Sequence, residues 1–190
     1  MTATQRCTYG DYLTWPDDRN DDLIDGVCYV RERPSPVPLH QALVRELLYQ
    51  VRTALEGKPC QVYPAPLDVR LPKSDEADEK VDTVLQPDLF IVCDRSKMDG
   101  RGLRGAPDWI AEVLSPSTAR HDQVRKLPVY ERAGVREAWF IHPTDQTLAI
   151  YRLEDRRYGR PEILELKGPT ALTSVPGVSI DWDRVLSHLL

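Results

Sequence analysis

The sequence lacks any uninterrupted apolar run of the roughly 18–20 residues that a membrane-spanning helix requires. Its first residues, MTATQRCTYGDYL, also lack the basic segment and following apolar segment of a secretory signal peptide. We therefore expect no membrane association, and a cytoplasmic location follows as the default. Repeats, low-complexity tracts and linkers are absent too, so residues 1–190 are predicted to form a single domain with a sizeable core.

Cysteine is scarce, and its spacing excludes the familiar zinc sites. Cys7, Cys28, Cys60 and Cys93 form no Cys-x-x-Cys pair, and none has a histidine at the spacing of a zinc ligand. We expect buried free thiols of the kind found in a reducing compartment.

Positive charge is in deficit, with 25 Lys and Arg against 30 Asp and Glu, a net charge of −5. This balance argues against non-specific binding along a nucleic-acid backbone. A local basic patch is compatible with this net charge, because the electrostatic field at a site depends on how the charges are distributed. Hydrophobic residues make up 41% of the chain, which indicates a folded globular protein.

Hydrophobic periodicity and turn residues predict the elements of the first half. They are a short capped helix at 8–13, a hairpin at 23–30 around Asp25-Gly26, a helix at about 39–56 ended by Gly57, and a strand at about 65–71. The charged stretch 72–82 is expected to be an exposed loop.

The second half alternates apolar strands with one amphipathic helix. We expect a buried strand at 87–93, a glycine-containing loop at 100–105, a strand at 109–114, a helix at 119–133 ended by Gly134, a strand at 138–142, an antiparallel pair at 148–153 and 163–166, and a closing helix capped by Asp181. Strand, helix and strand between residues 109 and 142 match the size of a right-handed βαβ crossover.

Two carboxylates occupy unusual places in these strands. Asp88 begins an otherwise apolar strand, and Glu112 lies in the middle of another. Buried carboxylates are costly unless they are paired, and a hard cation such as Mg²⁺ binds such groups together with waters and a carbonyl. The plainer alternatives are a turn residue for Asp88 and an ion pair with Lys126 for Glu112.

Lys126 lies on the predicted helix between Asp122 and Tyr130 at i, i+4 spacing, so the three share one face. A lysine there could reach over the strand ends and stabilise a phosphoryl transition state. An ordinary surface pair between Asp122 and Lys126 is the alternative that spacing alone favours.

Three other functions fit the sequence less well. Gly100-x-Gly102-x-x-Gly105 has dinucleotide-binding spacing but precedes a strand instead of following one, which excludes that site. Ser115 and Ser117 lack a nucleophile elbow. A glycosidase that uses Asp88 and Glu112 as acid and base lacks an aromatic platform for sugar.

Short motifs follow one another in a characteristic order along the chain. They are Tyr9-x-x-Tyr12-Leu13, Leu23-Ile24-Asp25-Gly26, Pro34-Ser35 with His40, Pro66-Leu67-Asp68-Val69, Gln86-Pro87-Asp88, Glu112-Val113-Leu114-Ser115-Pro116-Ser117-Thr118, Asp122-x-x-x-Lys126-x-x-x-Tyr130 and Gly134-Val135-x-Glu137-x-Trp139. In these motifs the chain resembles the Uma-two family of restriction endonucleases, within the PD-(D/E)XK nuclease superfamily.

The resemblance implies an α/β (α+β) fold of the restriction-endonuclease type, a mixed central sheet flanked by helices. It implies Mg²⁺- or Mn²⁺-dependent cleavage of nucleic-acid phosphodiesters, with DNA as the expected substrate and RNA left open, and often a homodimer. Asp88, Glu112 and the Val113 carbonyl would hold the metal, and Asp88, Glu112 and Lys126 would form the catalytic set.

The chain departs from the superfamily pattern at Leu114, where the motif lysine would stand. Lys126 matches a lysine that this family places on the next helix, although Pro128 interrupts that helix soon after. Asp68 and Gln86 are candidates for the same pocket, whereas His40 is expected to cap or pack. A non-catalytic scaffold used for binding or assembly is the rival hypothesis, favoured by the acidic balance and by Leu114.

Overall fold

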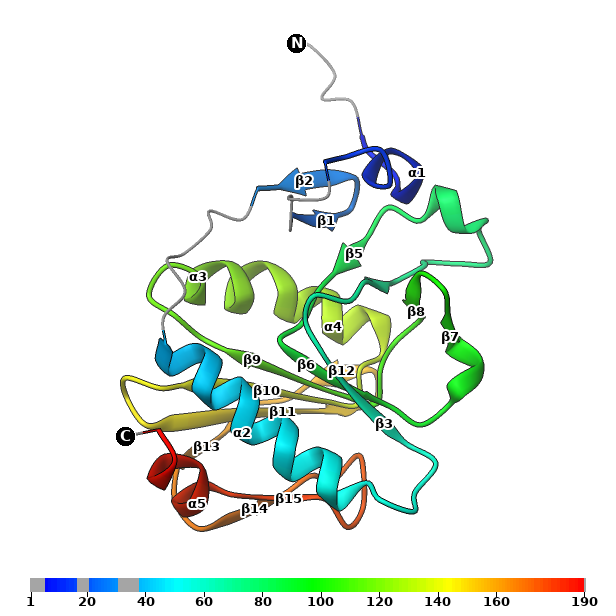
Figure 1. Ribbon diagram of the computed structural model, residues 1–190. Coiled ribbons are helices and arrows are strands. Elements are labelled where there is room, and N and C mark those ends of the chain that lie inside the picture. The colour runs from blue at the N-terminus through cyan, green and yellow to red at the C-terminus, as the bar shows by residue number, and fades with distance from the viewer. Residues whose placement is uncertain (1–5, 17–20, 31–37, 190) are drawn as a thin grey trace.

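The computed structural model describes residues 6–16, 21–30 and 38–189, and its centre is a mixed β-sheet with helices on both faces (Figure 1). Neighbouring strands follow the order β12, β11, β10, β9, β6, β3, and β13 also pairs with β11. Their bounds are β3 Gln61–Pro64, β6 Leu89–Val92, β9 Trp109–Val113, β10 Glu137–His142, β11 Thr147–Glu154, β12 Arg157–Tyr158 and β13 Glu162–Glu165.

The predicted crossover connects β9 and β10, which run parallel, whereas the other pairs of this sheet are antiparallel. Its helix consists of α3 (Ala119–His121), a π-helical segment (Asp122–Lys126) and α4 (Leu127–Ala133) in continuous succession. We call these 15 residues the crossover helix. Gly134 ends it with φ of +90°, a left-handed conformation that glycine adopts without strain.

The two faces of the sheet carry separate apolar layers. On one face α2 (Pro38–Ala54) buries its leucine and valine stripe against β9 and β10, and on the other face lies the crossover helix (Figure 1). Successive strand residues alternate between these layers: Leu89 and Ile91 belong to the α2 layer, and Phe90 and Ile110 to the other. The same alternation places Asp88 and Glu112 on the face of the crossover helix.

A second, smaller sheet lies beyond the crossover helix and is built from short strands in the order β2, β1, β5, β4, β8, β7. Their bounds are β1 Asp22–Ile24, β2 Val27–Tyr29, β4 Val69–Arg70, β5 Val84–Leu85, β7 Met98–Asp99 and β8 Gly102–Arg104. The predicted hairpin is present, with Asp25 and Gly26 at φ of 51° and 75° in the turn. Positive φ at both central residues is the geometry that an Asp-Gly turn favours.

Shorter elements complete the described chain. Thr8 and Asp11 form a capping box at the start of the predicted short helix, α1 (Tyr9–Tyr12), and Asp181 caps α5 (Trp182–Ser187) by accepting a hydrogen bond from the Arg184 amide. The remaining elements are the 3₁₀ turns Asp78–Lys80 and Arg95–Lys97 and the strand pair β14 (Pro169–Ala171) and β15 (Ser179–Asp181). Within the described ranges, no helix is both long and apolar enough to cross a membrane.

Three local predictions were wrong in whole or in part. The strand expected at 65–71 is split, because Pro64 and Pro66 lack the amide hydrogen that a strand ladder needs. The chain therefore leaves the large sheet at Pro64 and enters the small sheet at Val69. The stretch 72–82 contains a 3₁₀ turn whose Asp78 pairs with the buried Arg70, and the glycine-containing loop holds the β7–β8 hairpin.

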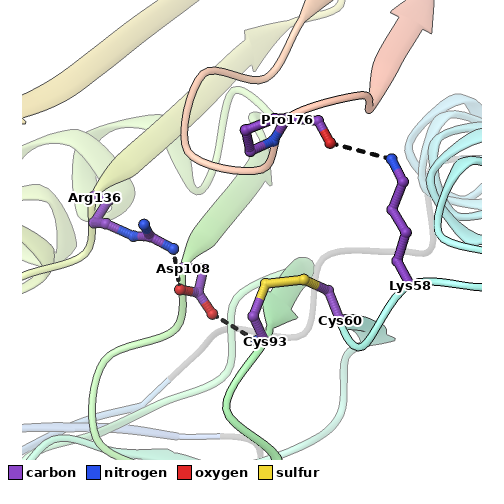
Figure 2. The surroundings of a disulfide bond; sticks show 6 residues. All are labelled: Lys58, Cys60, Cys93, Asp108, Arg136 and Pro176. Carbon is purple, nitrogen blue, oxygen red and sulfur yellow. Dashed lines mark hydrogen bonds and ion pairs between the residues drawn. A yellow bond between two sulfur atoms is a disulfide. The ribbon is translucent and has the colours of Figure 1, made fainter.

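The prediction of free thiols was wrong for two of the cysteines. Cys60 and Cys93 form a disulfide at the end of the β3–β6 ladder, where Gln61 opposes Val92 (Figure 2). The next residues outward along these antiparallel strands are the two cysteines, so the ladder brings them together across 33 residues of sequence. Among the described residues, Cys7 and Cys28 take no part in a disulfide, and both are half-buried.

Candidate functional site

Asp88 lies directly before β6, opposite Glu112 on the neighbouring strand. Because Leu89 pairs with Ala111 in this antiparallel ladder, Asp88 and Glu112 form the next cross-strand pair. The Asp88 Oδ2 atom accepts a hydrogen bond from the Val113 amide at 2.8 Å and lies 3.1 Å from His40 Nε2 at the start of α2. The sheet therefore joins the two predicted carboxylates.

His40 and Asp88 shift each other's proton affinities. Burial raises the pKa of Asp88, but the hydrogen bond and charge of His40, the Lys126 ammonium and the Val113 amide outweigh it, so the net shift is downward. The hydrogen bond to Asp88 raises the pKa of His40 above its ordinary value of 6.5, against the effect of burial. His40 thus contacts the site directly instead of merely capping or packing.

Glu112 and Lys126 form a fully buried ion pair, with Lys126 Nζ 3.0 Å from Glu112 Oε1. The Tyr130 hydroxyl donates a hydrogen bond of 2.5 Å to the same oxygen. Burial and the Glu112 carboxylate raise the pKa of Tyr130 well above its ordinary value, so this hydroxyl stays protonated and acts as a donor. The crossover helix places both donors above the strand, and the ion pair that the plainer reading of Glu112 expected is present.

Two further carboxylates surround the same lysine. Asp122 Oδ1 lies 3.0 Å from Lys126 Nζ, so the predicted Asp122–Lys126 pair exists but is buried, not on the surface. Asp22 Oδ2, from β1 of the small sheet, lies 3.9 Å from Lys126 Nζ and 2.8 Å from His121 Nε2. The site therefore joins side chains from both sheets.

We call Asp22, Asp88, Glu112 and Asp122 the acidic cluster. Their side chains are largely or fully buried, and one buried ammonium, that of Lys126, lies among them. The imidazoles of His40 and His121 are the neighbouring groups that can add positive charge on protonation. Four carboxyl groups thus lie around one permanent cation, and an excess of buried negative charge favours binding of a further cation.

Leu114, at the position of the superfamily lysine, is a buried apolar residue that packs in the layer beneath the crossover helix. Its backbone amide donates to the Ile141 carbonyl, as expected for a residue at the end of a central strand. Lys126 reaches the strand carboxylate from the crossover helix, although Pro128 follows two residues later. Pro128 stands in the first turn after the π-helical segment, where its missing amide is tolerated.

Asp68 and Gln86 do not belong to the acidic cluster. Asp68 precedes β4 of the small sheet, not a strand beside β6, and accepts hydrogen bonds from the Tyr9 and Tyr12 hydroxyls at 3.1 and 3.0 Å. Gln86 Nε2 donates to the same carboxylate at 2.9 Å. Burial and Asp68 raise the pKa of both tyrosines, which keeps them as donors. The expectation that Asp68 lies beside the Asp88 strand was wrong.

Sequence reasoning missed Asp22 and underrated His40. Asp22 ends a polar run that reads as a loop, and no local pattern indicates that its side chain is buried at 1% exposure. The residues of the Pro34-Ser35 motif lie outside the described residues.

A metal ion would find a limited set of side-chain donors here. Among the described parts of the chain, no three His, Cys, Asp or Glu side chains lie in an arrangement that could by itself hold a metal ion. Mg²⁺ needs fewer, since it is often held by one or two carboxylates with waters completing its octahedron. Asp88 and Glu112, opposite each other in an acidic surrounding, fit that requirement.

Comparison with known proteins gives one matching family and a similar solved structure. A model of the Uma2 family, described as "Putative restriction endonuclease", matches residues 9–183. A crystal structure described as "a putative nuclease belonging to DUF820", from Anabaena variabilis, superimposes with a TM-score of 0.74 at 19% sequence identity. The alignment covers 96% of this chain and 99% of that one, which confirms the predicted restriction-endonuclease-like fold. No curated protein gives a significant match.

Proposed function

Because this chain belongs to the Uma2 family of restriction endonucleases, we propose that it is a metal-dependent endonuclease that hydrolyses DNA phosphodiesters at Asp88, Glu112 and Lys126. The observation that carries this proposal is the acidic cluster, in which three buried carboxylates surround the buried Lys126 and the partly buried Asp88 lies opposite Glu112. A scaffold without a cationic ligand has no physical reason to retain such an excess of buried negative charge.

Asp88 and Glu112 would hold Mg²⁺ or Mn²⁺ together with the Val113 backbone carbonyl and water molecules. When bound, such an ion polarises the phosphodiester and lowers the pKa of the attacking water. The hydrogen bond from the Val113 amide to Asp88 Oδ2 fixes the Asp88 carboxylate relative to β9.

The remaining side chains orient these two carboxylates and tune their charge. Lys126 and Tyr130 both donate to Glu112 Oε1, which fixes the rotamer of that carboxylate and holds its charge in place. His40 contacts Asp88 from α2 and keeps its carboxylate ionised. The Lys126 ammonium also supplies positive charge close to where charge would develop on the phosphate.

Isothermal titration with Mg²⁺ or Mn²⁺ and cleavage of supercoiled plasmid DNA together test this function. We expect Glu112→Gln, which keeps the side-chain shape, to abolish both metal binding and metal-dependent cleavage. Asp68→Asn is the matched control, since Asp68 is a carboxylate bonded to tyrosines outside the acidic cluster, and it should leave both intact. Metal binding that survives Glu112→Gln unchanged would refute the assigned site.

The second candidate is a non-catalytic scaffold that serves in binding or assembly. The favouring observation is that Glu112, Lys126 and Tyr130 satisfy one another inside the fold. This reading predicts no metal binding at millimolar Mg²⁺ and no cleavage by the unmodified protein. The same experiments therefore separate the two functions, and light scattering of the purified protein tests the homodimer that the family resemblance implies.

A further inference from the structure

The outer face of the crossover helix is positively charged, in contrast to the acidic chain as a whole. Its exposed charged side chains are Arg120, Arg125 and Arg132, without an exposed acid among them. The helix also contains Asp122, which is buried against the lysine of the site, and Glu131, which accepts hydrogen bonds from Arg157 and the Tyr158 amide. Local charge on this face is therefore opposite in sign to the net charge.

Arg120 and Arg125 are the two of these arginines for which the described residues supply no ion-pair partner. Arg132 pairs with Asp25 at 2.9 Å. Among residues 6–16, 21–30 and 38–189, by contrast, neither Arg120 nor Arg125 lies in an ion pair. The π-helical segment between them has a wider turn than an α-helix, which brings residues five apart closer to one face.

Arg125 connects this face to the acidic cluster through a series of direct contacts. Its guanidinium lies over the Tyr29 ring, 4.1 Å from the ring centre, and the Tyr29 and His121 rings are 5.6 Å apart. His121 in turn contacts Asp22, which borders Lys126. The Arg125 guanidinium therefore lies beside the site, over Tyr29 of β2, which pairs with Asp22 of β1.

From this placement we infer that Arg120, Arg125 and the Tyr29 edge of the β1–β2 hairpin form the surface that binds the phosphodiester backbone of the DNA substrate. This inference rests on the proposed nuclease function, whose site it extends. The acidic cluster would repel a polyanion, so a substrate needs cationic contacts next to the site before its phosphate can approach. Arginine suits this task, because its guanidinium forms paired hydrogen bonds with phosphate oxygens.

The test is fluorescence anisotropy with a short labelled DNA duplex and with its single strand, in Ca²⁺ so that no cleavage is expected. Affinity is measured between about 50 and 200 mM salt for the unmodified protein and for Arg120→Ala/Arg125→Ala. Each lost phosphate contact should reduce the slope of log affinity against log salt by about 1, so the double variant should lose about 2 for duplex DNA.

Two control variants isolate the charge of this face. Arg52→Ala removes an exposed arginine near the other end of α2, about 18 Å along the helix from His40, and should leave the salt slope unchanged. Tyr29→Leu removes the ring beneath Arg125 but keeps its charge, so the salt slope should also be retained.

Each outcome decides one claim. If the double variant keeps the salt slope of the unmodified protein, or if Arg52→Ala loses as much of that slope, the proposed DNA-binding surface is wrong. Neither result contradicts the proposed metal-dependent cleavage. If Tyr29→Leu loses as much salt slope as the double variant, the effect of Arg125 comes from its packing on the ring. That result would also refute the proposed surface. RNA binding without DNA binding would reject the named substrate. Arginine-dependent DNA binding by a protein that never cleaves would instead reject the nuclease function alone.

Discussion

Replacing Lys126 by methionine tests the charge balance of the acidic cluster most directly. The variant keeps a long, unbranched side chain but removes the ammonium that lies 3.0 Å from both Glu112 and Asp122 and 3.9 Å from Asp22. Those carboxylates would then face one another without their shared buried cation. Removing one partner of a buried ion pair typically costs about 3–5 kcal/mol of folding free energy.

The loss should depend on pH in a defined direction. Without the ammonium, burial and like charge would favour the neutral form of these carboxyl groups in the folded state. The folded variant then binds more protons than the unfolded chain, so its stability falls as pH rises above roughly 4. We therefore expect a larger deficit relative to the unmodified protein at pH 8 than at pH 5.

Thermal and urea unfolding at the two pH values measure this deficit. For a chain of this length, about 4 kcal/mol corresponds to a fall in melting temperature of roughly 10 °C. Mg²⁺ should restore part of the lost stability, by about 1.4 kcal/mol when its concentration is ten times the dissociation constant. Lys80→Met, at an exposed position, is the control for loss of a lysine charge. A Lys126→Met variant as stable as the unmodified protein at pH 8 would refute the claim that these carboxylates are ionised.

Two other predictions follow from contacts outside the site. Cys60→Ser should lower the free energy of unfolding by about 3–4 kcal/mol under non-reducing conditions, because the Cys60–Cys93 bridge closes a long loop in the unfolded chain, and melts of this variant should be insensitive to reductant. Asp25 contacts Lys73 and Arg132, which lower its pKa below 3.8 although burial opposes them. Its stabilisation is present above that pH and is lost as the pH falls through the folded-state pKa, so Asp25→Asn should flatten the acid limb of the stability curve, measured by urea unfolding.

Local patterns in the sequence were sufficient for most of the large sheet. Apolar runs identified β6, β9 and β10. The spacing of β9, the crossover helix and β10 predicted the parallel pairing of the two strands, because a strand–helix–strand connection of this size forms a right-handed crossover. The Asp-Gly turn and the short capped helix at the N-terminal end were equally predictable from the sequence. These features depend on a few adjacent residues, which is why the chain alone determines them.

The site was predictable only in part. Asp88 and Glu112 stood out because charged residues are rare in apolar strands, and Lys126 shared a helix face with Asp122. That Lys126 is buried against Glu112 depends on how the crossover helix lies on the sheet, which sequence spacing does not specify.

Only the tertiary structure determines which side chains from distant segments of the chain lie together. Asp22 arrives from the small sheet, 104 residues before Lys126, and the disulfide joins the ends of two strands that only the ladder register brings side by side. The sequence by itself determined that Asp88 and Glu112 are costly to bury, since that follows from residue type and strand pattern. How many carboxylates share one lysine, and which arginines lie beside them, was decided by packing, because long-range contacts leave no trace in local sequence.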